Sequence, residues 1–241
     1  MVFHTSWQMK HRQVFFQPLV APGALVFDIG ANIGEFTAAF LSLGAGRVVA
    51  VEPQPELCRH IAASFPAALA DGRLAIRSCA VSAAPGRMRL HVASDPGHSM
   101  STLSPEFLAM SLRNGHVWDE AAAIDVDVVT LAQLIAEFGT PDYLKIDVEG
   151  HDLAVLQGLD RPVQLMSFEF NTDAGLIGLA DACIAHVAAL GDYEFNFQAE
   201  APGMVELQLE PWVDAEVMTY ILRNDVSRSP VYGDVFCRLR G

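Results

Sequence analysis

A glycine loop directly after a short apolar run constrains the fold of this chain more than any other feature. The run covers Ala24–Asp28, and the loop continues as Ile29-Gly30-Ala31-Asn32-Ile33-Gly34 before a segment with helical spacing of apolar residues. An apolar run that stops at turn residues is typical of a buried strand, and glycines in the turn let the backbone approach a ligand that a Cβ would obstruct. This strand–loop–helix unit predicts an open α/β sheet with a ligand site beyond the carboxyl ends of its strands.

The rest of the chain alternates between strand-like runs and helix-like segments, as a doubly wound sheet requires. Strands are expected at 24–28, 48–51, 74–79, 87–93, 126–129, 143–147, 163–170, 193–197, 204–209 and 235–239. Helices are expected at 3–19, 36–43, 57–65, 130–138, 153–158, 174–190 and 215–222. The late strands look antiparallel, so the pattern predicts a three-layer α/β sandwich around a mostly parallel, seven-stranded sheet with an antiparallel edge strand. We expect one domain over 23–241, preceded by an N-terminal helical extension over 1–22.

The composition indicates a soluble protein and limits its partners. Hydrophobic residues make up 51% and charged residues only 18% of the chain, which argues against disorder. A net charge of −14 would repel a phosphate backbone, so we expect no nucleic-acid partner. No apolar run approaches the ~20 residues of a spanning helix, so we expect no integral membrane contact. The four cysteines lack paired spacing, and buried free thiols suit a cytoplasmic location.

A carboxylate at the end of the second predicted strand indicates an adenosyl ligand. Glu52 follows the glycine loop by about 20 residues, where a carboxylate can accept both ribose hydroxyls. Nicotinamide dinucleotides and S-adenosylmethionine share this arrangement, but the dinucleotide fingerprint is GxGxxG whereas this loop is DxGxNxG. Asp28 is placed to meet a cationic amine, such as that of a methionine moiety, and Glu35 would oppose a pyrophosphate. S-adenosylmethionine is therefore the favoured cofactor, and a glycine turn without a ligand is the alternative.

Two acids end another buried strand at the same edge of the sheet. In the segment YLKIDVEGHD, Asp147 and Glu149 lie where an acid can position a substrate hydroxyl or take its proton. Glu149 or Asp152 could instead cap the following helix. His151 could be a base near neutral pH, although a lone histidine in a first helical turn is more often a polar surface group. We expect Asp147 to be the base or the group that orients the hydroxyl, with Glu149 as the second candidate.

A third strand end carries Glu169 and Asn171. With Asp147 they could converge as oxygen ligands for a hard cation such as Mg²⁺. A substrate-facing or structural role for Glu169 fits the pattern equally well, so no metal is assigned. The polar loop 98–103 is the best candidate for a mobile edge over the pocket, with an ordinary hairpin loop as the alternative.

Over about 23–239, these motifs resemble the FkbM family of S-adenosylmethionine-dependent methyltransferases. The resemblance rests on VFDIGANIGEFT, VEPQPE, GDVFCRL and, most specifically, VTLAQLI with YLKIDVEGHDLAVLQGL. It implies a class I methyltransferase (Rossmann-like) fold and O-methylation, typically of a hydroxyl on a sugar or secondary metabolite. The family's cofactor positions and its KIDVEG acids correspond here to Asp28, Gly30, Asn32, Gly34, Glu52, Asp147 and Glu149.

Two departures from the family pattern stand out. Asp152 occupies a position where members often carry Glu. The strand that ends at Cys79-Ala80-Val81 lacks the acid that many methyltransferases use against adenine, so we expect recognition by the backbone at Ala80.

Two rival functions stay open at this point. One is a catalytically silent S-adenosylmethionine-binding interaction protein, and the other is a nicotinamide-dependent oxidoreductase, against which the missing GxGxxG counts. The sequence does not name the methyl acceptor. It also leaves open whether the chain forms a homo-oligomer and whether the N-terminal helix closes the pocket.

Overall fold

The apolar runs form strands whose side chains are buried on both faces of a sheet. In β1 (Leu25–Ile29), for example, Val26 faces one core cluster while Phe27 and Ile29 face another, and all three are almost fully buried. These observations come from a computed structural model that describes residues 6–93, 100–116, 118, 122–172, 176–199, 206–228 and 231–241. Burial on both faces explains why these runs lack polar alternation.

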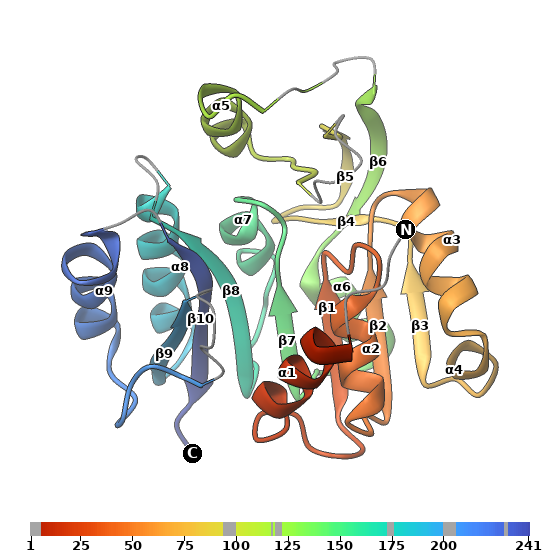
Figure 1. The fold of residues 1–241 in the computed structure, drawn as a ribbon, viewed down its shortest axis with the longest axis horizontal. Helices are drawn as coiled ribbons and strands as arrows, with labels where there is room; N and C mark the ends of the chain where they lie inside the picture. Colours follow the sequence, from red (N-terminus) through yellow and green to blue (C-terminus); the bar gives the residue numbers. More distant parts are fainter. Residues whose placement is uncertain are drawn as a thin grey trace.

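Seven strands form the main sheet in the order β3-β2-β1-β7-β8-β10-β9 (Figure 1). Besides β1, they are β2 (Arg47–Val51), β3 (Leu74–Arg77), β7 (Tyr143–Ile146), β8 (Leu165–Asn171), β9 (Tyr193–Ala199) and β10 (Tyr232–Leu239). The pairings from β3 through β8 are parallel, whereas β10 runs antiparallel to both β8 and β9. The predicted mostly parallel sheet is confirmed. Its antiparallel strand lies one position in from the edge, because β9 pairs with the outer side of β10.

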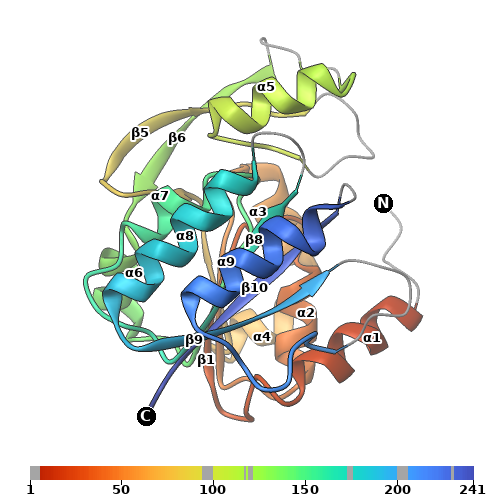
Figure 2. The same cartoon turned by 90° about the vertical axis from the view of Figure 1, so that its left-hand side faces the viewer.

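Helices cover both faces of this sheet (Figure 2). Those on the first face are α1 (Ser6–Phe16), α2 (Glu35–Ser42), α3 (Pro55–Ser64) and α4 (Pro66–Ala70). Those on the second face are α6 (Leu131–Phe138), α7 (Asp152–Leu156), α8 (Ile177–Leu190) and α9 (Ala215–Asn224), which is followed by a short 3-10 helix, η2 (Val226–Arg228). The predicted three-layer sandwich is therefore confirmed.

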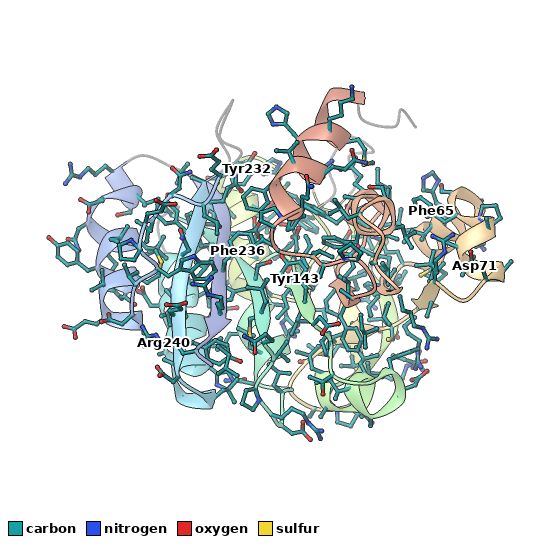
Figure 3. All side chains as sticks on the ribbon, turned by 90° about the horizontal axis from the view of Figure 1, so that it is seen from below. Phe65, Asp71, Tyr143, Tyr232, Phe236 and Arg240 are labelled. Atoms are coloured by element: carbon teal, nitrogen blue, oxygen red, sulfur yellow. The ribbon has the colours of Figure 1, made fainter. Side chains whose placement is uncertain are left out.

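Helix α1 packs into the core that the rest of the chain forms. The Phe16 ring lies 5.2 Å from that of Phe40 and 5.9 Å from that of Tyr143, measured between ring centroids. Figure 3 shows Tyr143 and Phe236 near the middle of the molecule, and Phe236 also contacts Phe16. The described part of the expected extension over 1–22 therefore belongs to the first helical layer.

A second, three-stranded sheet stands above the carboxyl edge of the main sheet (Figure 1). It contains β4 (Ala80–Val81), β6 (Ile124–Val129) and β5 (Gly86–Leu90), and α5 (Pro105–Arg113) lies beside it. We call these three strands and α5 the cap. The strand expected at 74–79 ends at Arg77, because the chain then leaves the main sheet and pairs β4 with β6.

The strand expected at 204–209 is not confirmed. Residues 204 and 205 lie outside the described residues, and 206–209 form no strand. Isolated hydrogen bonds to β9 take the place of regular strand pairing there. The Gln208 N–H donates to the Phe197 carbonyl, and the Leu209 N–H donates to Oδ1 of Asn196.

Candidate active site

A cavity of about 660 Å³ lies between the carboxyl edge of the main sheet and the cap. Its walls come from the glycine loop, the ends of β2 and β7, the start of β10, α1 and the cap. The sequence-predicted residues on these walls are Gly30, Asn32, Glu52, Ala80, Asp147, Glu149 and Glu169. The topology thus brings together residues more than a hundred positions apart, as expected for a ligand site at the switch point of an α/β sheet.

Gly30 is required by the close approach of two strand ends. Its φ is +83°, and a Cβ at this position would lie 1.8 Å from the backbone oxygen of Asp147. The N–H groups of Gly30 and Ala31 both donate to the carbonyl of Val51, at 2.9 and 3.0 Å. These bonds hold the loop against the end of β2. Only a residue without a side chain fits between β1 and β7 here.

Glu52 presents a fixed carboxylate to the cavity. Its Oε2 accepts a hydrogen bond from the Asn32 backbone N–H at 3.0 Å, and its Oε1 accepts one from the Gln54 N–H at 2.9 Å. Burial raises the pKa of Glu52 to about 7, although both hydrogen bonds favour the ionised form. Asn32, at φ +49°, thus contributes through its backbone.

Asp28 and Gly34 lie beneath the loop rather than on the cavity wall. The Asp28 side chain is fully buried, and its Oδ2 accepts a hydrogen bond from Thr37 Oγ1 of α2 at 2.6 Å. Burial raises the pKa of Asp28, and Lys145 on the neighbouring strand opposes that rise. The contact between Asp28 and a ligand amine stays a prediction, because Asp28 does not line the cavity in this structure. Gly34, at φ +87°, is the N-cap of α2, and a Cβ there would approach the side chains of Ile61 and Phe65 to 3.2 Å.

Lys145 is a buried cation that the sequence reasoning missed. Its Nζ donates to Asp147 Oδ2 at 2.8 Å and lies 4.1 Å from the centre of the Phe36 ring, while the residue is 1% exposed. Burial alone would lower the pKa of Lys145, but the carboxylates of Asp147, Asp28 and Asp234 outweigh burial and raise it. A lysine inside the otherwise apolar strand YLKI was the available signal, because buried lysines are rare unless paired.

Asp147 and Glu149 occupy different electrostatic surroundings on the same wall. Lys145 neutralises Asp147, whose side chain is 34% exposed. Glu149 has a φ of +54°, and its pKa is raised well above its usual value by burial and then by the nearby Asp147 and Asp152 carboxylates. Helix α7 begins after His151, which forms no side-chain capping bond, and the described residues give Glu149 no capping bond either.

Two further acids lie near Glu149. Burial raises the pKa of Glu169 well above its usual value, and Glu149 raises it further. Asp152 is almost fully buried, and burial together with Asp147 raises its pKa to about 7. Of the three oxygen ligands that the sequence left open, Asp147 and Glu169 line this cavity, whereas Asn171 lines a small neighbouring cavity together with Glu169. In the part of the chain that the structure describes, no three acids, histidines or cysteines are grouped to hold a metal.

The segment just before α5 reaches the site through hydrogen bonds. Thr102 Oγ1 donates to the Glu149 carbonyl at 2.7 Å, and Gln54 Nε2 donates to Ser101 Oγ at 3.2 Å. His151 also lines the cavity, and its Nε2 lies 3.0 Å from Ser82 Oγ. Burial lowers the pKa of His151 and Glu106 opposes the shift, so the neutral ring is favoured. Of the loop expected at 98–103, residues 98 and 99 lie outside the described residues.

Comparison with known proteins identifies the family. A family model described as the methyltransferase FkbM domain matches residues 28–200, well over half of the chain. The chain belongs to the FkbM methyltransferase family. The match includes both the glycine loop and the KIDVEG segment, which lie side by side on the cavity wall.

Two curated methyltransferases are similar to the chain over part of their length. Methyltransferase sdnD from Sordaria araneosa is 31% identical over 160 residues, which cover 56% of this chain and 60% of that protein. The 31-O-demethyl-FK506 methyltransferase FkbM from Streptomyces tacrolimicus is 32% identical over 160 residues, which cover 58% of this chain and 60% of the relative. The match therefore spans about 60% of the length of each of these relatives.

Solved structures share the fold of this FkbM-family chain. The methyltransferase FkbM structure from Methylobacillus flagellatus superposes with a TM-score of 0.52 at 14% identity, over 89% of this chain and 43% of that one. An O-methyltransferase from Bacillus cereus in complex with SAH superposes with a TM-score of 0.50 at 14% identity, over 99% and 83%. At this identity the likeness establishes the class I methyltransferase fold.

Two other sequence expectations can be compared with the structure. All four cysteines, Cys58, Cys79, Cys183 and Cys237, are buried free thiols, as predicted. Among the described residues, no helix has the length and apolar character needed to cross a membrane.

Proposed function

We propose that this chain is an S-adenosylmethionine-dependent O-methyltransferase whose acceptor is a hydroxyl of a small molecule, such as a sugar or secondary metabolite. One observation carries the proposal: Glu52 and Asp147 lie on the walls of a single cavity, with Gly30 between them. An oxygen acceptor is supported by the name of one relative, which describes methylation of 31-O-demethyl-FK506.

The residues around Glu52 suit an adenosyl group. Each Glu52 oxygen accepts one backbone N–H and keeps lone-pair capacity for a ribose hydroxyl. Leu57, Ala80 and Val81 add an apolar wall beside it. Apolar lining with a few fixed polar groups is the usual character of a cofactor pocket. The site therefore fits the nucleoside half of S-adenosylmethionine.

The acids of the β7 end suit the handling of a hydroxyl proton. S-adenosylmethionine, when bound, supplies a methyl group already activated on a sulfonium. Asp147, whose Oδ2 accepts a hydrogen bond from Lys145 Nζ at 2.8 Å, also accepts one from the acceptor hydroxyl and orients it. Such alignment is worth about 7–11 kcal/mol in well-oriented systems.

Glu149 is the proton acceptor. Burial and the Asp147 carboxylate raise its pKa, so its carboxylate is more basic than that of an ordinary glutamate, and a positioned general base contributes roughly 10²–10⁴-fold. We therefore assign orientation to Asp147 and proton removal to Glu149. These two residues are the catalytic candidates expected from the sequence.

The substitution Asp147→Asn tests this assignment. The variant should bind S-adenosylhomocysteine as the wild type does but lose about 10²-fold in kcat, because an amide cannot carry the oriented negative charge. The assay is release of S-adenosylhomocysteine with the best acceptor from a panel of hydroxylated glycosides and polyketides, paired with calorimetric binding. Asp160→Asn, on the exposed Arg161 ion pair, is the control. Unchanged turnover in Asp147→Asn would remove the proposed role.

Binding experiments separate the rival functions. Wild-type protein should bind S-adenosylhomocysteine and not NADH, and Glu52→Ala should weaken that binding at least about tenfold through lost ribose contacts. Binding without turnover on any acceptor would favour the catalytically silent protein. Binding of NADH alone would favour an oxidoreductase.

A further inference from the structure

The cavity walls carry many negative charges and few positive ones. Six carboxyl groups line the cavity: Glu35, Glu52, Asp147, Glu149, Glu169 and Asp234. Among the described residues on these walls, Arg12 is the only arginine or lysine. Lys145 lies behind the wall, and its ammonium forms an ion pair with the Asp147 carboxylate. An anionic group on a ligand therefore has one cationic side chain to meet at the surface of this cavity.

Arg12 is held in place from two directions. Its Nη2 lies 2.7 Å from Glu35 Oε2, and its guanidinium carbon lies 4.8 Å from the centre of the Phe36 ring. The Arg12 side chain is 22% exposed, so it is partly withdrawn from water. A guanidinium carries five N–H donors in a planar fork that matches the two oxygens of a carboxylate. Glu35 and Phe36 therefore hold such a fork on the cavity wall.

Position along the cavity indicates which part of a ligand Arg12 meets. Glu52 and Ala80 lie at the β2–β4 end, where the adenosine belongs under the proposed function. Gly30 lies between that end and β7, so the rest of the ligand extends over the glycine loop. Arg12 faces this second half of the cavity from α1, because its partner Glu35 follows the loop directly.

We propose that Arg12 binds the α-carboxylate of the methionine moiety of S-adenosylmethionine, and that α1 is in this way part of the cofactor site. The inference rests on the proposed function. The methionine head group carries one ammonium and one carboxylate. The acids that line the same cavity, Glu35 and Asp234 among them, suit the ammonium, and Arg12 suits the carboxylate. The role is one of binding and positioning.

Arg12→Gln, Arg12→Lys and a pair of ligands test the proposal. The ligands are S-adenosylhomocysteine and its decarboxylated analogue, which lacks only the carboxylate, and their Kd values are measured by calorimetry. Wild-type protein should prefer S-adenosylhomocysteine by about ten- to a hundredfold, the usual effect of a hydrogen bond to a charged group. Arg12→Gln should lose this preference by weakening S-adenosylhomocysteine alone, and Arg12→Lys should keep part of it. Arg59→Gln, on an exposed pair in α3, is the matched control and should behave as wild type.

The outcomes separate a failure of the proposed function from a failure of the role of Arg12. If wild-type protein binds neither ligand, the proposed function itself fails. If wild type binds S-adenosylhomocysteine but does not discriminate against the decarboxylated analogue, or if Arg12→Gln discriminates as well as wild type, only the role of Arg12 is overturned. The wild-type comparison needs no variant, so misfolding of Arg12→Gln would not rescue the proposal.

Discussion

Asp28 and Glu52 both stand at strand ends on the same edge of the sheet, yet only Glu52 reaches the cavity. The difference arises from the direction of each side chain. Asp28 points into the α2 layer and binds Thr37, whereas Glu52 lies beyond the last residue of β2 and folds back toward the glycine loop. A sequence motif therefore predicts where a residue lies along a strand, whereas the packing of the neighbouring helix determines what its side chain contacts.

Replacing Gly30 with alanine should destabilise the protein severely. The new Cβ would have to lie 1.8 Å from the Asp147 carbonyl oxygen at a positive φ, so β1 and β7 would have to separate. We expect a loss of at least about 3 kcal/mol in the free energy of unfolding, measured by urea denaturation.

Gly178 provides the control for this prediction. It lies exposed in α8, and a Cβ there would meet nothing within 4 Å. Gly178→Ala should stabilise the protein by about 0.5–1 kcal/mol, as expected for a helical glycine replaced by alanine. Equal effects of the two substitutions would contradict the steric account of Gly30.

At the level of elements, a hydrogen bond from the segment just before α5 holds the turn at 147–150. Thr102 is completely buried, donates to the Glu149 carbonyl, and accepts from the Ser104 N–H at 2.8 Å. Ser104 in turn caps α5 by accepting from the Phe107 N–H. The same short segment thus begins a cap helix and fixes the backbone of Glu149.

Thr102→Val should loosen both ends of this connection. Valine has the shape of threonine but no hydroxyl, so the buried Glu149 carbonyl and Ser104 N–H would lose their partner at a cost of about 1–3 kcal/mol. Hydrogen exchange should speed up at 147–150 and at 102–107. Thr130→Ala, which removes the capping box of α6, should cost about 1 kcal/mol without that change in exchange. Unaltered exchange at 147–150 in Thr102→Val would show that the cap does not fix the turn.

For the whole molecule, the acids around the cavity make stability depend on pH. The pKa is about 7 for both Glu52 and Asp152 in the folded protein, against reference values of 4.5 and 3.8. Between those values the folded state holds more protons than the unfolded state, so stability falls as pH rises. Glu149 and Glu169, whose pKa values are also raised, act in the same sense. His151, whose pKa is lowered, acts in the opposite sense below about 6.5.

We therefore expect the protein without cofactor to be more stable at pH 6 than at pH 8, by about 2 kcal/mol or more in urea unfolding. Asp152→Asn should be more stable than wild type at pH 8 and should reduce this fall by about 1 kcal/mol, because the amide has no charge to bury. A wild-type stability that rises from pH 6 to pH 8 would contradict the assignment of these buried acids.

Local patterns in the sequence determined the main sheet, the free cysteines and most of the cavity wall. A buried parallel strand is a continuous apolar run, and the residue after it must lie at the carboxyl edge, so Glu52, Asp147 and Glu149 could be placed in advance. The KIDVEG resemblance likewise pointed to the family before any fold was known. These local patterns do not identify the methyl acceptor.

Tertiary structure alone decided the features that depend on distant pairing. The cap exists because β4 pairs with β6 across more than forty residues, a choice that no local pattern records. Arg12 reaches the cavity because the aromatic rings of α1 pack beneath α2, and Asp28 is withdrawn because Thr37 and Lys145 surround it. Sequence periodicity states which face of an element is buried, whereas the partner on that face is chosen by packing of the whole chain.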